Sequence, residues 1–209
     1  VICLLPELFN FKSLLCLLSY TLFLRKIYSL KSNKNILQKL FDMGFWLGVL
    51  FIMEPISILF ITLIYLSIFL FKKITLHTVF GPFFGFIAPL IIYYCYELWQ
   101  NNTVELSKLY QINLKFDLIL FNDSKYSVFL IFIAIIGFIC MLLKSVKAFS
   151  INNNFRKKWI LILCNFLVAI FVLLLHTDIK ENHLIYLLFP VSIILANGVE
   201  MIPKKIIKN

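Results

Sequence analysis

The sequence has few charged residues and lacks the common motifs of soluble enzymes. Charged residues make up 14% of the 209 residues, and there are 6 glycines and 6 prolines. There is no P-loop, GxGxxG or GxSxG motif, so the signatures of nucleotide binding and of a nucleophilic serine are absent. The 3 histidines are too few for haem or a multi-metal site. These patterns identify no cofactor.

Cysteines are few and isolated. None has the CxxC spacing of a metal or redox site, so the sequence predicts neither a disulfide framework nor a thiolate metal centre. Each stands alone in an apolar stretch, where cysteine behaves as a small buried hydrophobe. The five positions are Cys3, Cys16, Cys95, Cys140 and Cys164.

The beginning of the chain lacks the features of a signal peptide. The sequence opens with Val1 rather than methionine and enters an apolar segment almost at once. It has no basic n-region, short h-region and small-residue cleavage site in succession. We therefore expect that an upstream portion of the protein precedes this sequence.

Hydrophobic residues are abundant. They form 62% of the chain, and the mean hydropathy is +0.96, whereas soluble domains are about 45–50% apolar. The net charge of +10 lies beside the apolar segments, where anionic lipid headgroups are closer partners than nucleic acid. The composition therefore predicts an integral membrane protein whose partner is the lipid bilayer, with no role in nucleic-acid binding.

The apolar segments predict an all-α fold, a polytopic transmembrane helical bundle that forms a single domain over residues 1–209. A helix over 45–71 would be about 40 Å long, against a hydrocarbon core of about 30 Å. We therefore predict a helical hairpin broken at Glu54-Pro55, since proline suits the first turn of a helix. The first limb, about 18 Å long, is too short to cross fully. The predicted segments are 8–24, 42–53, 55–71, 80–99, 127–143, 159–175 and 184–200.

The distribution of lysine and arginine predicts the orientation. Fifteen of the 20 basic residues fall within 25–42, 72–76, 144–158 and 201–209. With Lys12 left out as membrane-embedded, the hairpin puts 15 basic residues on one side and 4 on the other, whereas a continuous span divides them 9 to 10. Basic loops remain in the cytoplasm. The hairpin therefore predicts a bacterial inner-membrane protein with a cytoplasmic C-terminus.

Glu54 is the first candidate for a polar site. A carboxylate inside an apolar run is costly, which indicates contact with a headgroup, a cation or a proton. Alternatively, Glu54 caps the second limb by accepting N–H bonds at its positive end. We favour the cap, because Glu-Pro at a helix start needs no further explanation.

A second candidate is the turn at 176–183, which contains His176, Asp178, Lys180 and His183. Such side chains can ligate zinc or hold a phosphate. A solvated turn between two spans has the same composition, and no HxxxH or HExxH spacing is present. We favour the solvated turn and predict no metal.

Several motifs resemble known membrane proteins. Gly44-Phe-Trp-Leu-Gly48, Glu54-Pro55, Lys72-Lys73 and Gly85-Phe-Ile-Ala-Pro89 resemble the membrane core of GT-C glycosyltransferases that use polyprenyl-phosphate sugars. His183-Leu-Ile-Tyr-Leu-Leu-Phe-Pro190 is similar to the Arg-Tyr-Leu-Leu-x-x-Pro final span of those enzymes. With Asp42-Met-Gly44-Phe-Trp46 the pattern resembles more closely a Bacteroidota family of multi-pass membrane proteins known as a domain of unknown function.

The resemblance implies a fold more than an activity. Glu54 stands where the GT-C pattern has lysine, and Ile185 stands where it has the arginine that contacts lipid phosphate. The catalytic acid of those enzymes lies in a first extracytoplasmic loop, upstream of this sequence. The expected function is handling of polyprenyl-phosphate-linked sugars in envelope glycan assembly, with the turn at 176–183 near the phosphate. The alternative is a non-enzymatic scaffold or accessory subunit beside other membrane subunits; a transporter is less favoured, since no inverted repeat is visible.

Overall fold

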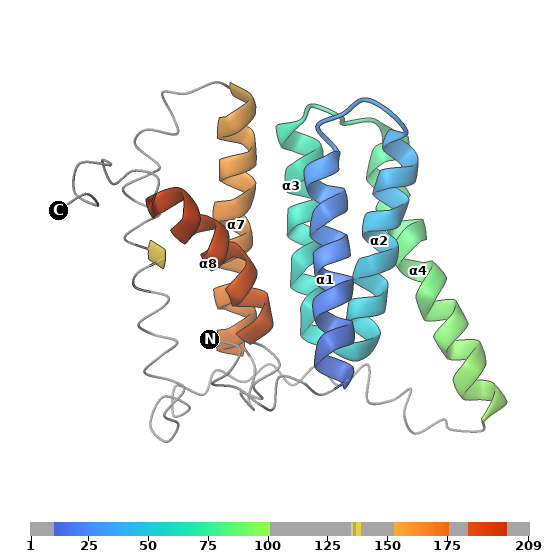
Figure 1. Cartoon of the computed structure of the whole chain (residues 1–209). Coiled ribbons are helices and arrows are strands. Elements are labelled where there is room, and N and C mark those ends of the chain that lie inside the picture. Colours follow the sequence, from blue (N-terminus) through green and yellow to red (C-terminus); the bar gives the residue numbers. More distant parts are fainter. Residues whose placement is uncertain (1–10, 101–134, 136, 139–152, 176–183, 200–209) are drawn as a thin grey trace, which may run out of the picture. The chain divides into compact units, whose positions relative to one another are not determined.

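All regular elements that the structure describes are helices. The structure is a computed structural model that describes residues 11–100, 135, 137, 138, 153–175 and 184–199 (Figure 1). The chain divides into two compact units, residues 1–115 with 180–182 and residues 116–179 with 183–209. The first contains α1 to α4 and the second contains α7 and α8. The predicted helical class is therefore confirmed for the described residues.

The first two helices are longer than the sequence predicts. Helix α1 spans Phe11–Ser29, whereas the predicted segment, 8–24, ends before the first basic pair. Lysine and arginine are good helix formers, so this pair continues the helix. Helix α2 spans Ile36–Met53, six residues more than the predicted limb 42–53. Its 18 residues reach about 27 Å, so the prediction of a limb too short to cross was wrong.

The predicted break at Glu54-Pro55 is present. Glu54 is extended, with φ −144° and ψ 99°, because a residue before proline is disfavoured in the helical region and Pro55 has no N–H to donate. The Ser57 N–H donates to the Glu54 carbonyl at 3.0 Å, which starts the 3₁₀ helix η3, Pro55–Phe60. Helix α3, Ile61–Leu70, follows. The predicted limb 55–71 is thus a 3₁₀ turn followed by an α-helix, not a single α-helix.

Helix α4, Leu76–Trp99, begins four residues before the predicted segment 80–99. A capping box determines this start: the Thr75 hydroxyl accepts from the Thr78 N–H at 3.3 Å, and the Thr75 N–H donates to Thr78 Oγ1 at 2.8 Å. Pro82 and Pro89 lie inside the helix and remove two backbone hydrogen bonds, a common cause of kinks. Figure 1 shows α4 diverging from α2 towards its C-terminal end.

Glycines bring α2 and α4 into backbone contact. A Cβ on Gly44 would lie 2.0 Å from the Pro82 carbonyl oxygen, and one on Gly85 would lie 2.1 Å from the Phe41 carbonyl oxygen. Neither position can hold a side chain without separating the helices. Gly44 and Gly48 form one GxxxG motif, and Gly81 and Gly85 form another. Small residues at this spacing allow close helix packing in membranes.

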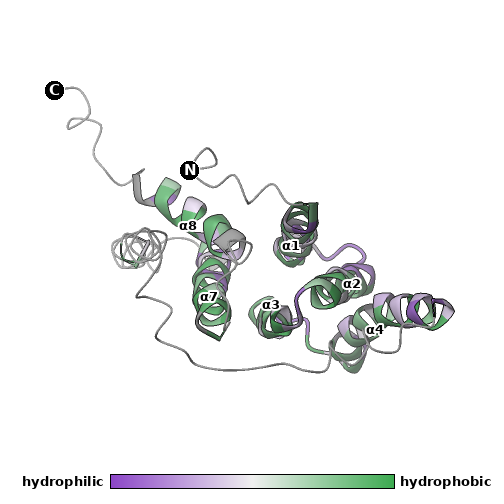
Figure 2. Ribbon diagram, turned by 90° about the horizontal axis from the view of Figure 1, so that it is seen from below, coloured by the Kyte–Doolittle hydropathy of each residue, from purple (hydrophilic) through white to green (hydrophobic). Residues whose placement is uncertain are grey.

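Aromatic and aliphatic side chains fill the interior of the first unit. The ring of Phe60 lies 5.1 Å from that of Tyr20 and 6.4 Å from that of Phe23, centroid to centroid. All three are fully buried, as are Leu40 and Leu47 of α2. Figure 2 shows hydrophobic residues along these helices and hydrophilic residues in the loop between α1 and α2.

The second unit pairs α7, Asn153–Leu175, with α8, Leu184–Val199. Helix α7 begins six residues before the predicted segment 159–175, so the last basic residues of segment 144–158 are helical. Helix α8 matches the predicted segment 184–200 to one residue. The core between the two helices consists of Trp159, Leu163, Phe166, Leu187, Val191 and Ile194.

One predicted segment can be only partly placed. Of the segment 127–143, the structure describes residues 135, 137 and 138, which are helical. A Cβ on Gly137 would lie 3.3 Å from the Phe166 ring and 3.7 Å from Val191, so this residue packs on α7 and α8. The rest of this segment lies outside the described residues.

Candidate functional site

The order of the helices places two basic loops at one end of the first unit. Figure 1 shows α1 and α3 running in one direction and α2 and α4 in the other, so the loops α1–α2 and α3–α4 lie together. Lys73 Nζ of the second loop donates a hydrogen bond to Asn33 Oδ1 of the first. The segments 25–42 and 72–76 therefore share one end, as the hairpin predicts. We call it the basic end.

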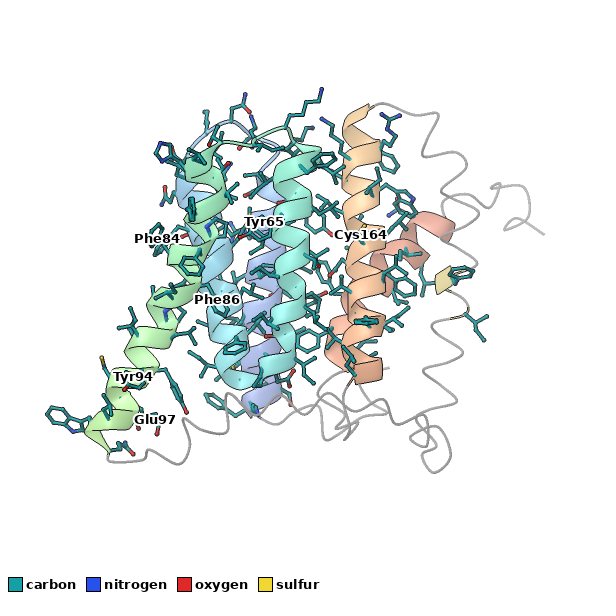
Figure 3. All side chains as sticks on the ribbon, turned by 180° about the vertical axis from the view of Figure 1, so that it is seen from behind. Tyr65, Phe84, Phe86, Tyr94, Glu97 and Cys164 are labelled. Atoms are coloured by element: carbon teal, nitrogen blue, oxygen red, sulfur yellow. The ribbon has the colours of Figure 1, made fainter. Side chains whose placement is uncertain are left out.

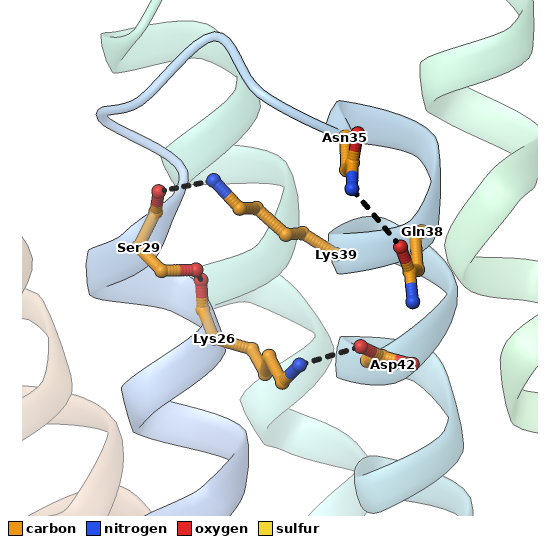
Figure 4. Close-up of polar contacts among 6 residues, drawn as sticks. All are labelled: Lys26, Ser29, Asn35, Gln38, Lys39 and Asp42. Carbon is orange, nitrogen blue, oxygen red and sulfur yellow. Dashed lines mark hydrogen bonds and ion pairs between the residues drawn. The ribbon is translucent and has the colours of Figure 1, made fainter.

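Polar contacts hold the α1–α2 loop in place (Figure 4). Lys26 Nζ lies 2.6 Å from Asp42 Oδ2, and the two side chains are 33% and 26% exposed. Lys39 Nζ donates to the Ser29 carbonyl oxygen at 2.9 Å and also to the Ser32 hydroxyl. Asp42 is the one carboxylate among five basic residues of segment 25–42. The basic end therefore has an excess of positive charge.

The two helices that begin at the basic end are capped differently. The Thr75 and Thr78 side chains cap α4, whereas Asn35, at the start of α2, makes no side-chain capping bond. Asn35 is left-handed, with φ 51°, and its Nδ2 donates to Gln38 Oε1 at 3.4 Å. The first-turn N–H groups of α2 thus receive no side-chain acceptor from Asn35, whose backbone carbonyl accepts from the Lys39 N–H at 3.1 Å. Free N–H groups at a helix start add to the positive potential there.

An apolar groove of about 760 Å³ opens beside these helix starts. Helix α2 contributes Leu37, Gln38 and Phe41. Helix α4 contributes His77, Phe80 and Phe84 among others, and Figure 3 shows Phe84 projecting from the outer side of α4. Phe80 and Phe84 are 55% and 61% exposed. Among the described residues, the groove therefore has apolar walls and takes polar side chains from Gln38 and His77.

Glu54 lies at the opposite end of the first unit, where α2 meets η3. The residue is 6% exposed, and its backbone N–H donates to the Leu50 carbonyl at 2.8 Å. Its side chain makes no capping hydrogen bond to η3. The interpretation of Glu54 as a side-chain cap was therefore wrong, because its carbonyl, not its carboxylate, accepts the first bond of η3.

Glu97 is a buried carboxylate that the sequence analysis did not single out. It is 4% exposed and lies near the C-terminal end of α4 (Figure 3). Its Oε2 has no hydrogen-bond partner among the residues that the structure describes. The local sequence gave no signal of this burial, because the adjacent Tyr96 and Leu98 are exposed. Glu54 and Glu97 both lie away from the basic end.

The other predicted site residues cannot be placed. His176, Asp178, Lys180 and His183 lie outside the described residues. Within the described ranges there is no group of three or more His, Cys, Asp or Glu side chains that could hold a metal ion. The structure thus brings together basic loops and an apolar groove, and it separates Glu54 from them.

The length and hydropathy of the helices indicate the class of the protein. It is a helical protein in which α2 and α4 are long and apolar enough to cross a membrane. A family model described as "Family of unknown function (DUF6427)" matches residues 1–209. The chain belongs to this family. No curated protein and no solved structure matches it.

Proposed function

We propose that this chain is a multi-pass protein of the bacterial inner membrane that handles polyprenyl-phosphate-linked sugars in envelope glycan assembly. Both units then belong to one membrane domain of about seven segments, with the basic end and the C-terminus in the cytoplasm. One observation carries the membrane assignment: the outward side of α4 is apolar along its length. Phe83, Ile91 and Ile92 are 53%, 55% and 65% exposed.

An apolar surface of this kind is more stable in contact with bilayer lipid than in contact with water. Exposing large apolar side chains to water costs roughly 25 cal/mol per Å², and contiguous exposed patches indicate a membrane or partner surface. The separation of charge supports the orientation, since the basic loops share one end and the buried carboxylates lie away from it. The polyprenyl-phosphate assignment rests on the resemblance of Gly44–Gly48 and Gly85–Pro89 to GT-C enzymes.

A scaffold without catalysis is the second proposal, and the same side of α4 favours it. Helices that present small residues to one neighbour and large apolar residues outward can also pack against helices of another subunit. Under this alternative, the other membrane subunits cover Phe83 and Ile91.

The two proposals predict different lipid pools. A strain that lacks the gene should accumulate a polyprenyl-phosphate sugar if the protein handles that lipid, as measured by mass spectrometry of extracted membranes. Unchanged lipid-linked sugars, together with co-purification of the intact protein in a defined membrane complex, would favour the scaffold. Recovery of the protein in the soluble fraction would refute both.

A further inference from the structure

The groove between α2 and α4 has an asymmetry that the proposed function does not explain. Its walls are apolar and open, and its polar side chains come from the first turns of the two helices. Leu37 and Gln38 lie in the first turn of α2, and His77 lies in that of α4. The groove therefore has a polar mouth at the basic end and an apolar remainder.

Basic residues lie in the segments just before the two helices whose first turns form the mouth. Lys34 precedes α2 by two residues, and Lys72 and Lys73 precede α4 within a few residues. Lys34 and Lys72 are exposed. The one carboxylate of segments 25–42 and 72–76, Asp42 in α2, is engaged by Lys26. Backbone N–H groups at the start of α2 add further donors. An anionic headgroup is complementary to this mouth.

We propose that this groove binds an anionic glycerophospholipid of the cytoplasmic leaflet, with its acyl chain against Phe41, Phe80 and Phe84 and its phosphate at the mouth. The groove volume, about 760 Å³, lies within the roughly 300–1,000 Å³ of ligand pockets. Clustered basic residues next to a membrane helix attract anionic lipids. Gln38 and His77 supply side-chain N–H donors for the phosphate oxygens. The inference rests on the membrane assignment of the proposed function, not on its sugar chemistry.

Gly81 permits a test that leaves the helix contact intact. It lines the groove, and a Cβ placed on it meets nothing closer than Leu40 Cβ at 3.5 Å. Gly81→Leu should therefore fill the groove from within, whereas Gly81→Ala should leave it open. The full chain is purified in mild detergent, and phosphatidylglycerol retention is measured against phosphatidylcholine by native mass spectrometry.

We expect the wild type and Gly81→Ala to retain phosphatidylglycerol in preference to phosphatidylcholine, and Gly81→Leu to lose it. Lys72→Gln with Lys73→Gln should reduce the preference about thirtyfold, because it removes two charges from the loop that precedes α4, each contributing about 1 kcal/mol. Equal retention by Gly81→Leu would overturn the proposal, as would displacement of the lipid by inorganic phosphate alone. A lipid-free dimer that closes the groove would also overturn it.

The polyprenyl lipid is tested in parallel, so that the two proposals fail separately. Added polyprenyl phosphate that occupies the groove in place of phosphatidylglycerol would reject this inference and support the proposed function. Retention of phosphatidylglycerol with no change in lipid-linked sugars in the deletion strain would support this inference and reject the sugar chemistry.

Discussion

At the scale of the residue, Glu54 is the most informative side chain. It is buried, and it stands at a helix break without capping the following helix. Buried carboxylates in membrane segments are costly and usually functional. The carboxylate does not cap η3, so contact with a headgroup, a cation or a proton, the other interpretation drawn from the sequence, is the prediction to test.

We expect Glu54→Gln to fold normally and to fail in the cell. Glutamine keeps the volume and one acceptor oxygen, so thermal stability in detergent should stay within about 1 kcal/mol of the wild type, the scale of one hydrogen bond. Growth and envelope integrity should match the deletion strain. Asp42→Asn is the matched control, since its carboxylate is partly exposed. A Glu54→Gln strain with wild-type growth would contradict the functional interpretation.

The Lys26–Asp42 ion pair should contribute little stability despite its 2.6 Å contact. Both side chains are partly exposed, and water and salt screen such pairs. A double-mutant cycle with Lys26→Met and Asp42→Asn should give a coupling free energy of about 0.2–1 kcal/mol. Thermal unfolding in detergent measures it. A coupling several times larger would indicate that the bilayer excludes water from this pair.

At the scale of the element, the close crossing of α2 and α4 depends on glycines, which have no side chain, at the contact. Gly85→Ala would place a Cβ 2.1 Å from the Phe41 carbonyl oxygen, and overpacking of this kind costs about 1–3 kcal/mol. Gly81→Ala, one turn earlier in the same helix, is the control, because its nearest neighbour is 3.5 Å away. It should be neutral or stabilising by up to about 1 kcal/mol, since alanine favours helix. Equal unfolding temperatures for the two variants would disprove the close approach.

The capping box at the start of α4 should also be measurable. Thr75→Val removes the side-chain acceptor for the Thr78 N–H but leaves the Thr75 carbonyl, which accepts from the same N–H at 3.0 Å, and should cost about 1 kcal/mol. Thr75→Ser keeps the hydroxyl and should restore most of that loss. Circular dichroism during thermal unfolding compares the two. If serine and valine were equally destabilising, packing of the threonine methyl group would be the cause.

At the scale of the whole molecule, the structure joins the two basic loops and thereby limits the possible topologies. Single cysteines at Asn33 and Lys73, in a background without the native cysteines, should both resist impermeant thiol reagents in intact cells. A cysteine at Asn153 should resist them as well, and one at Asn102 should react. The expectation follows from the retention of basic loops in the cytoplasm. If the cysteines at Asn33 and Lys73 reacted and the one at Asn102 were protected, the orientation would be the opposite of the one predicted.

Much of the fold followed from the sequence because its signals are local. Pro55 has no N–H to donate and disfavours a helical conformation at the residue before it, so the break could be predicted locally. Apolar segments of adequate length form helices in any bilayer. Boundaries were less predictable. Residues 36–41 are part of α2 and residues 153–158 are part of α7, although neither was included in a predicted segment. Polar residues such as lysine, arginine and glutamine also favour helix.

The candidate site depended on tertiary structure. The sequence by itself determined a helical, apolar chain with clustered basic loops, because composition and periodicity are properties of single segments. Only the tertiary structure shows that Lys73 donates a hydrogen bond to Asn33, that Gly44 lies against the backbone of Pro82, and that Glu97 is buried. These contacts join segments far apart in the chain, and their geometry depends on how neighbouring helices pack, which no local pattern encodes.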